Sequence, residues 1–276
     1  ANGEMMGLTL GQAVRAMGLN LLGDMRLTDE GAFPLLAKYL DARENLSVQV
    51  HPSPAYARKH HGAKLKTETW YVVDAAPDAA IYRGFREGVT KKDVEKAVRS
   101  GDGSSLQPLL RRVPVRAGDV HHLPSGTCHA LGAGVMVAEI QTPSDTTFRL
   151  WDWGRTHRTV HIDEALECID IDERGDAVRG PGHGRSVVAH TEFYDLIEWF
   201  LPDGTEHAVE PTAQRPMVWM VLDGEGIITF DTTNGVRQAP IHIHRGKTVV
   251  IPAMLKGARV AWERDAHVLE VAFPQV

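Results

Sequence analysis

The stretch that decides the fold is Asn45–Pro52, NLSVQVHP, in which apolar and polar residues alternate. Side chains of a strand point to opposite faces in turn, so Val48 and Val50 fall on one face and Gln49 and His51 on the other. Amide and imidazole groups are both able to bind a metal ion. The sequence therefore predicts a strand that presents two candidate metal ligands on one face.

Two further segments extend this candidate site. Lys66–Val72, KTETWYV, reads as a strand on which Glu68 and Trp70 share a face. In Gly118–His129, GDVHHLPSGTCH, the pattern G-x5-P-x-G-x2-H has the spacing of the second motif of cupin barrels. A mixed nitrogen and oxygen ligand set suits Zn²⁺ or a similar divalent ion, one per chain. The predicted ligands are Gln49, His51, Glu68 and His129.

Four motifs in order, SVQVHP, KTETWYVVDA, PSGTCHALGAG and AEIQTPSDTTFRLWDWGR, resemble those of the class I mannose-6-phosphate isomerases, which are zinc-dependent double-cupin enzymes. The resemblance runs from about Gly3 to the C-terminus. It implies an all-β fold with a small helical insert, built as a double cupin of two jelly-roll-like β-barrels. Family members usually carry more chain before Thr9, so we expect either a truncated chain or a short branch.

The chain is expected to form two domains. Residues 1–180 would be the metal-binding catalytic cupin, with the helical insert around residues 90–112, and residues 181–276 a C-terminal cupin-like domain. The turn-rich Gly180–Arg185, GPGHGR, is the expected boundary. Gly246–Pro252 repeats the G-x5-P frame, but Gly257 stands where the first copy has His129. We therefore predict that the second domain binds no metal.

A few helices are expected among the strands. Thr9 and Thr90 are suitable N-cap residues, and glycine follows each of the two apolar stripes. Ala32–Leu40 is expected to be a buried strand whose Lys38 extends its amine to solvent. The expected helices are Thr9–Met17, Thr90–Gly101, Ser104–Arg112 and His161–Ile169.

Three charged residues are candidates for catalysis. Lys66 shares the face of Glu68, where it would either contact substrate oxygens or pair with Glu68 or Asp74. Glu139 lies on an alternating strand and would act as an acid, a base or a support for the metal, unless it forms a structural salt bridge with Arg149. The resemblance places Arg149 at the active site, where its cation would bind a phosphate or an oxyanion.

Composition restricts the class of protein. The 276 residues include 24% charged and 43% hydrophobic residues, the balance of an ordinary globular protein. A net charge of −6 argues against nucleic-acid binding, and no apolar run approaches the roughly 20 residues that span a membrane. The N-terminus does not read as a signal peptide, and two cysteines do not suggest a disulfide framework. A cytoplasmic location is therefore expected.

The function implied by the resemblance is the interconversion of mannose 6-phosphate and fructose 6-phosphate by a metal-dependent aldose–ketose isomerase. Its partner would be a small-molecule sugar phosphate, and the base could be Glu139, a histidine or a metal-bound water. Two alternatives stay open at this point. One is a non-catalytic sugar-binding or regulatory cupin. The other is an iron-dependent cupin dioxygenase, which the amide in the ligand set makes less favourable.

Overall fold

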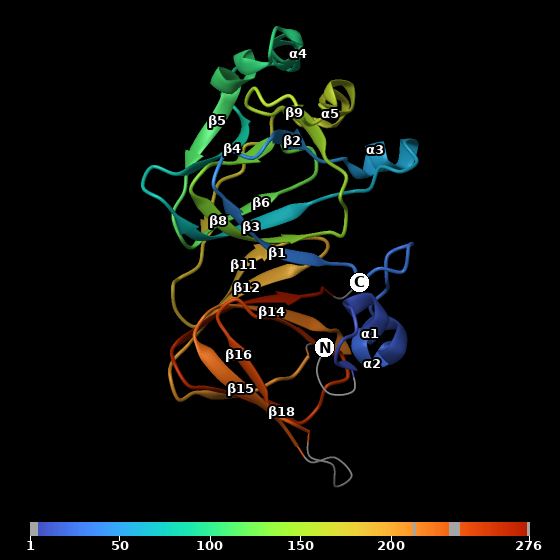
Figure 1. The fold of residues 1–276 in the computed structure, drawn as a ribbon, viewed down its shortest axis with the longest axis vertical. Coiled ribbons are helices and arrows are strands. Elements are labelled where there is room, and N and C mark those ends of the chain that lie inside the picture. Colours follow the sequence, from blue (N-terminus) through green and yellow to red (C-terminus); the bar gives the residue numbers. More distant parts are fainter. Residues whose placement is uncertain (1–4, 212–213, 232–237, 275–276) are drawn as a thin grey trace. The chain divides into compact units, whose positions relative to one another are not determined.

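The computed structural model describes residues 5–211, 214–231 and 238–274. It divides into two compact units (Figure 1), one formed by Leu35–Val178 and the other by Ala1–Pro34 with Arg179–Val276. Residues 1–34, which we expected in the first domain, thus group with the C-terminal part. The cause lies in their contacts: Ala253 N donates to Leu21 O over 2.9 Å, and the Arg215 guanidinium pairs with the Asp24 carboxylate at 2.7 Å.

The unit Leu35–Val178 contains two five-stranded sheets. In the first, the strand order is β1 (Leu36–Ala42), β8 (Val135–Gln141), β3 (Glu68–Ala75), β6 (Asp119–Leu123) and β10 (Val178–Arg179). In the second, the order is β5 (Leu110–Pro114), β4 (Ala80–Phe85), β7 (His129–Leu131), β2 (Val48–Val50) and β9 (Phe148–Trp151).

The inner faces of these two sheets share one hydrophobic core. Trp70 and Val137 of the first sheet pack in the same buried cluster as Ile81 and Leu131 of the second. Residues two positions apart on a strand share a face, so Glu139, two residues after Val137, also points inward. The space between the sheets therefore holds apolar side chains at one end and polar ones at the other.

Helices cover the outer face of the second sheet. α3 (Pro54–Lys59), α4 (Lys91–Arg99), the 3-10 helix η2 (Ser104–Leu109) and α5 (Ile162–Cys168) contribute to a buried cluster with Val48, Val50 and Phe148. The helix expected after Thr90 is confirmed, with Thr90 as its N-cap. The second expected helix of the insert is only six residues long and contains Pro108, which cannot donate a backbone hydrogen bond.

The other unit begins with α1 (Leu10–Met17) and α2 (Leu19–Leu22). The predicted cap Thr9 is confirmed, since it forms a capping box with Gln12. One sheet has the order β11 (Arg185–His190), β12 (Asp195–Leu201), β19 (Ala266–Ala272), β14 (Met217–Asp223) and β17 (Thr248–Ile251). The other sheet has the order β13 (Glu206–Ala208), β18 (Ala258–Trp262), β15 (Glu225–Phe230) and β16 (Ile241–His244).

These two sheets also enclose a core, which includes Trp219, Val268, Ile228 and Val260. The expected all-β double-cupin fold is thus confirmed, although within the described residues each expected barrel is a pair of packed sheets that hydrogen bonds do not close. None of the helices within the described ranges is long and apolar enough to cross a membrane.

Candidate metal centre

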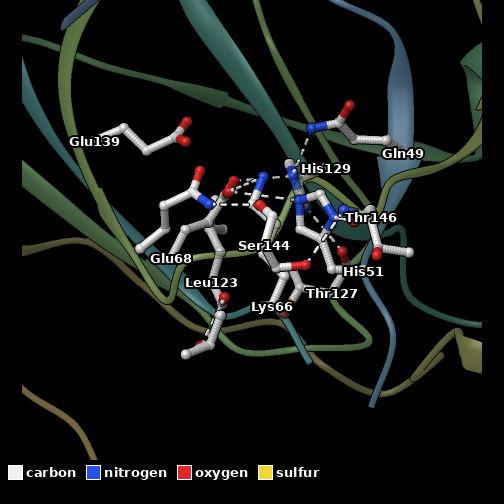
Figure 2. Close-up of polar contacts among 12 residues, drawn as sticks. Gln49, His51, Lys66, Glu68, Leu123, Thr127, His129, Glu139, Ser144 and Thr146 are labelled. Atoms are coloured by element: carbon white, nitrogen blue, oxygen red, sulfur yellow. Dashed lines mark hydrogen bonds and ion pairs between the residues drawn. The ribbon is translucent and has the colours of Figure 1, made fainter. Parts of the chain in front are cut away.

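Three buried side chains from different strands meet between the sheets of the unit Leu35–Val178 (Figure 2). His51 follows β2, Glu68 begins β3 and His129 begins β7. Each is at most 1% exposed, and their candidate ligand atoms all lie within 4.8 Å of one another. Three of the four predicted ligands are therefore brought together by strands whose sequences lie far apart.

A glycine turn sets the position of His129. Gly126 has a φ of +92°, and its amide donates to His51 O over 3.1 Å. A β-carbon at this position would lie 3.0 Å from Cys168 O, so a side chain would be both strained and crowded. The turn after Pro124 thus attaches the loop before His129 to the backbone at His51, which follows β2.

Backbone carbonyls orient both imidazole rings. His51 Nδ1 lies 3.1 Å from Thr146 O, and His129 Nδ1 lies 2.8 Å from Thr127 O. A carbonyl only accepts, so both Nδ1 atoms carry the proton and both Nε2 atoms present a lone pair. These lone pairs face Glu68: Nε2 of His129 is 3.1 Å from Oε1, and Nε2 of His51 is 3.4 Å from Oε2.

The protonation states suit a divalent cation. Burial lowers the pKa of His51 to about 4, so its ring is neutral near pH 7. Burial alone would raise the pKa of Glu68, but the positive charges that its neighbours can carry, the buried Lys66 ammonium among them, outweigh this effect and hold that pKa well below its ordinary value. A neutral His51 ring and an ionised Glu68 carboxylate turn acceptor atoms toward one another.

Such a group of acceptors is unfavourable unless a cation lies between them. His51 Nε2 and both Glu68 oxygens are buried and make no hydrogen bond at good geometry, and Lys66 Nζ pairs with Glu68 Oε2 from one side at 2.8 Å. The donor set of two imidazoles and a carboxylate is one that zinc-type ions bind. The residues present therefore fit a metal.

Gln49, the fourth predicted ligand, lies beside this group. It is directly opposite His129 in the β2–β7 register, and its Nε2 is 3.2 Å from His129 Nε2. Its Oε1 faces Ser47 Oγ at 3.4 Å. The amide thus presents its nitrogen to the site, and a half-turn about its last bond would present the oxygen. Its role as a ligand stays a prediction.

Lys66 makes one of the two pairings left open by the sequence. It is buried, and its Nζ lies 2.8 Å from Glu68 Oε2 (Figure 2). The lysine therefore places a positive charge against the candidate metal ligand, inside the polar end of the space between the sheets. Its contact with substrate oxygens stays a prediction.

Glu139 has a different partner from the one that we considered. Its Oε1 pairs with Lys38 Nζ at 2.7 Å, and its Oε2 accepts a hydrogen bond from Trp70 Nε1 over 2.9 Å. The alternative salt bridge with Arg149 was wrong. Lys38, whose amine we expected in solvent, directs that amine to Glu139 instead, although its side chain is 36% exposed. The reason is register: Lys38 of β1 lies directly opposite Glu139 of β8, 101 residues later in the chain.

The environment of Glu139 favours its protonated form. Burial raises the pKa of this carboxyl, and the nearby Glu68 raises it further, against the opposing charges of Lys66 and Lys38. The pairing of Lys38 with Glu139 was not predicted from the sequence, because the two residues lie far apart in the chain. The charge of Lys38 in an otherwise apolar strand was the one indication of it. The structure thus adds a lysine–glutamate pair to the predicted site.

Arg149 lies on the strand next to Gln49. The two residues are in register across the β2–β9 pair, so their side chains leave the same face of the sheet. Arg149 is half-buried and its Nη1 donates to Thr159 O over 2.7 Å, while its buried Nε has no hydrogen-bond partner. Burial lowers the pKa of this guanidinium, although it stays charged at neutral pH.

Comparison with known proteins identifies relatives of this chain. Residues 2–81 match the family described as phosphomannose isomerase type I, catalytic domain. A mannose-6-phosphate isomerase of Streptococcus mutans is 34% identical over 249 residues, which cover 87% of this chain and 73% of the relative. The probable mannose-6-phosphate isomerase GmuF of Bacillus subtilis is 35% identical over 264 residues, 91% of this chain and 78% of the relative.

Solved structures agree with the fold. The crystal structure of a mannose 6-phosphate isomerase from Bacillus subtilis has a TM-score of 0.79 at 25% identity and covers 99% of this chain and 84% of its own. A phosphomannose isomerase from Salmonella typhimurium has a TM-score of 0.76 at 14% identity, covers 97% of this chain and 86% of its own, and supports the fold alone. The identity and coverage shared with the Streptococcus and Bacillus sequences show that this chain belongs to the mannose-6-phosphate isomerase family.

Proposed function

We propose that this chain interconverts mannose 6-phosphate and fructose 6-phosphate at the group formed by His51, Glu68 and His129. The observation that carries the proposal is the meeting of three buried acceptor groups beside the Lys38–Glu139 pair in a chain of this family. The acceptors supply a cation site, and the pair supplies a group that can exchange a proton. An aldose–ketose isomerase needs both, because charge develops on the sugar oxygens while a proton moves between two carbons.

The cofactor that we propose is one Zn²⁺ per chain, held by His51, Glu68 and His129, with the oxygen of Gln49 as the fourth ligand. Support comes from the two imidazole lone pairs that face one carboxylate and from the position of Gln49 opposite His129. When bound, the ion would supply positive charge to the oxygens of the reacting carbons without any redox chemistry.

Glu139 is the residue that we propose moves the proton between C2 and C1 of the sugar. Its raised pKa supports this role, because a carboxyl works best as a base and then as an acid when its pKa is closer to the working pH. Lys38, at 2.7 Å, would hold the carboxylate in place and stabilise its ionised state. Of the three candidate bases, a carboxylate, a histidine and a metal-bound water, the environment of Glu139 therefore favours the carboxylate.

Two cations would bind the substrate. Lys66 carries a buried positive charge at the polar end of the site, where it would face the sugar oxygens that become negative. Arg149 lies on the same sheet face as Gln49 and has a buried Nε without a partner, which suits an oxyanion or the phosphate.

The proposal is tested by incubating the purified protein with mannose 6-phosphate and measuring fructose 6-phosphate with an enzyme-coupled assay. We expect turnover in both directions and no oxygen consumption. Oxygen uptake with bound iron would favour the dioxygenase alternative. Binding of mannose 6-phosphate without turnover, by protein loaded with zinc, would favour the non-catalytic one.

A further inference from the structure

Gln141 is a buried amide at the edge of the candidate site. It is the last residue of β8, is fully buried, and lies directly opposite Glu68 in the β3–β8 register. It is also two residues after Glu139, so the two side chains leave the same face of the strand. A buried amide is costly unless all of its polar groups are bonded.

The hydrogen bonds of Gln141 fix the orientation of its amide. Nε2 donates to Thr142 O over 2.9 Å and to Ser144 O over 2.8 Å. Both partners are carbonyls, which only accept, so the nitrogen must point to them and the oxygen must point away. That oxygen accepts a hydrogen bond from Lys38 Nζ over 3.0 Å.

Lys38 is thereby held from two sides. Its Nζ contacts Glu139 Oε1 at 2.7 Å and Gln141 Oε1 at 3.0 Å. Its side chain is 36% exposed, so water competes for the ammonium, and a flexible four-carbon stem gives it other positions to occupy. Because two backbone carbonyls fix the orientation of the Gln141 amide, its oxygen restricts where the Lys38 ammonium can lie.

We propose that Gln141 is a positioning residue that acts through Lys38. It keeps the ammonium against Glu139, so that the carboxylate that exchanges the proton is correctly placed when the substrate arrives. This inference rests on the isomerase function proposed above. Gln141 itself would not contact the reacting atoms, so its effect on the rate depends on the presence of Lys38.

A double-mutant cycle on the metal-loaded enzyme tests the dependence. Gln141→Met removes the acceptor at similar volume, and we expect kcat to fall about tenfold, the size of losing one hydrogen bond to a charged group. KM for mannose 6-phosphate should change by less than about threefold, since binding is not the affected step. In the Lys38→Met background, Gln141→Met should lower kcat no further.

Gln141 also holds the backbone at Thr142 and Ser144, so the experiment must distinguish an effect through Lys38 from an effect through this loop. Ser144→Ala provides the matched control, because it removes two hydrogen bonds from the same loop, from Ser144 Oγ to Lys64 O and from Thr146 N to Ser144 Oγ, without touching Lys38. Its effect on kcat should be the same factor with or without Lys38. If Gln141→Met does not fold, Gln141→Asn keeps a buried amide that is too short to span both sets of partners, and it enters the same cycle.

The outcomes are distinct. Loss of the Gln141 effect in the Lys38→Met background supports the inference. Equal losses in both backgrounds, or a change in KM with kcat unchanged, would overturn it while leaving the isomerase function intact. A wild-type protein that binds zinc but shows no isomerase activity would overturn the proposed function and this inference with it.

Discussion

Replacement of Glu139 by glutamine separates catalysis from structure at this site. The substitution keeps the size of the side chain and an oxygen that can accept the hydrogen bond from Trp70 Nε1, which spans 2.9 Å in the native protein. It removes the negative charge that faces Lys38 Nζ at 2.7 Å. The variant therefore loses one ion pair and the ability to exchange a proton, and its amide nitrogen faces the Lys38 ammonium, which must move aside.

The two losses differ in size. Lys38 is 36% exposed, so its ammonium is hydrated when the partner charge disappears, and we expect stability to fall by about 1–2 kcal/mol. General acid–base catalysis by one positioned side chain contributes about 10² to 10⁴ in rate, so kcat should fall by at least about 100-fold. The change in rate is far larger than the change in stability can explain.

The second unit offers a matched control in Glu270. This carboxylate is 2% exposed, accepts a hydrogen bond from Trp219 Nε1 over 3.2 Å and pairs with Arg185 Nη2 at 2.6 Å. It repeats the pattern of a tryptophan, a buried glutamate and a half-exposed cation, and the residues described around it include no group of candidate metal ligands. Glu270→Gln should cost a similar stability and leave kcat within about twofold of wild type.

The assay is steady-state turnover of mannose 6-phosphate on zinc-loaded variants, with urea unfolding of the same samples. Similar stability losses with a kcat loss confined to Glu139→Gln would support Glu139 as the proton-transferring group. An unchanged kcat in that variant, or equal kcat losses in the two variants, would refute the reasoning.

Three further predictions concern the charges and the ligands. Arg149→Ala should lower kcat about 100-fold while metal content measured by elemental analysis stays at the wild-type value; an unchanged turnover number would remove Arg149 from the site. Gln49→Ala should weaken zinc affinity at least about tenfold in a competition titration with a chelator, and an unchanged affinity would exclude it as a ligand. His121 has a pKa that burial lowers to about 4 from 6.5, so the unfolded state binds more protons between these values and stability falls as pH decreases through this window. Metal-free wild type should lose about 2 kcal/mol from this histidine between pH 7 and 5, and urea unfolding of His121→Gln should show a correspondingly smaller loss.

Local patterns in the sequence predicted much of the candidate metal centre. The alternation around His51, the face shared by Glu68 and Trp70, and the glycine–proline frame before His129 each depend on residues close together in the chain. Strand periodicity and turn chemistry are local rules, so a single sequence is enough to apply them. They also gave the N-cap of α1 at Thr9.

Pairing between distant strands could not be predicted in the same way. The partner of Glu139 is Lys38, and the sequence alone did not give the β1–β8 register that places them opposite each other. Gln141 was overlooked for the same reason, because its importance comes from Lys38 and from carbonyls in the loop that follows. The grouping of residues 1–34 with the C-terminal part likewise depends on tertiary contacts, such as that of Arg215 with Asp24.

The most direct test of the account is a metal titration of isomerase activity. The protein is stripped with a chelator, Zn²⁺ is added back in steps, and conversion of mannose 6-phosphate to fructose 6-phosphate is measured at each step. We predict no activity without metal and a linear rise that stops at one equivalent per chain, with no rise for a variant in which His51 and His129 are both alanine. Full activity in the stripped protein, or no activity in folded protein that has bound zinc, would contradict the central claim.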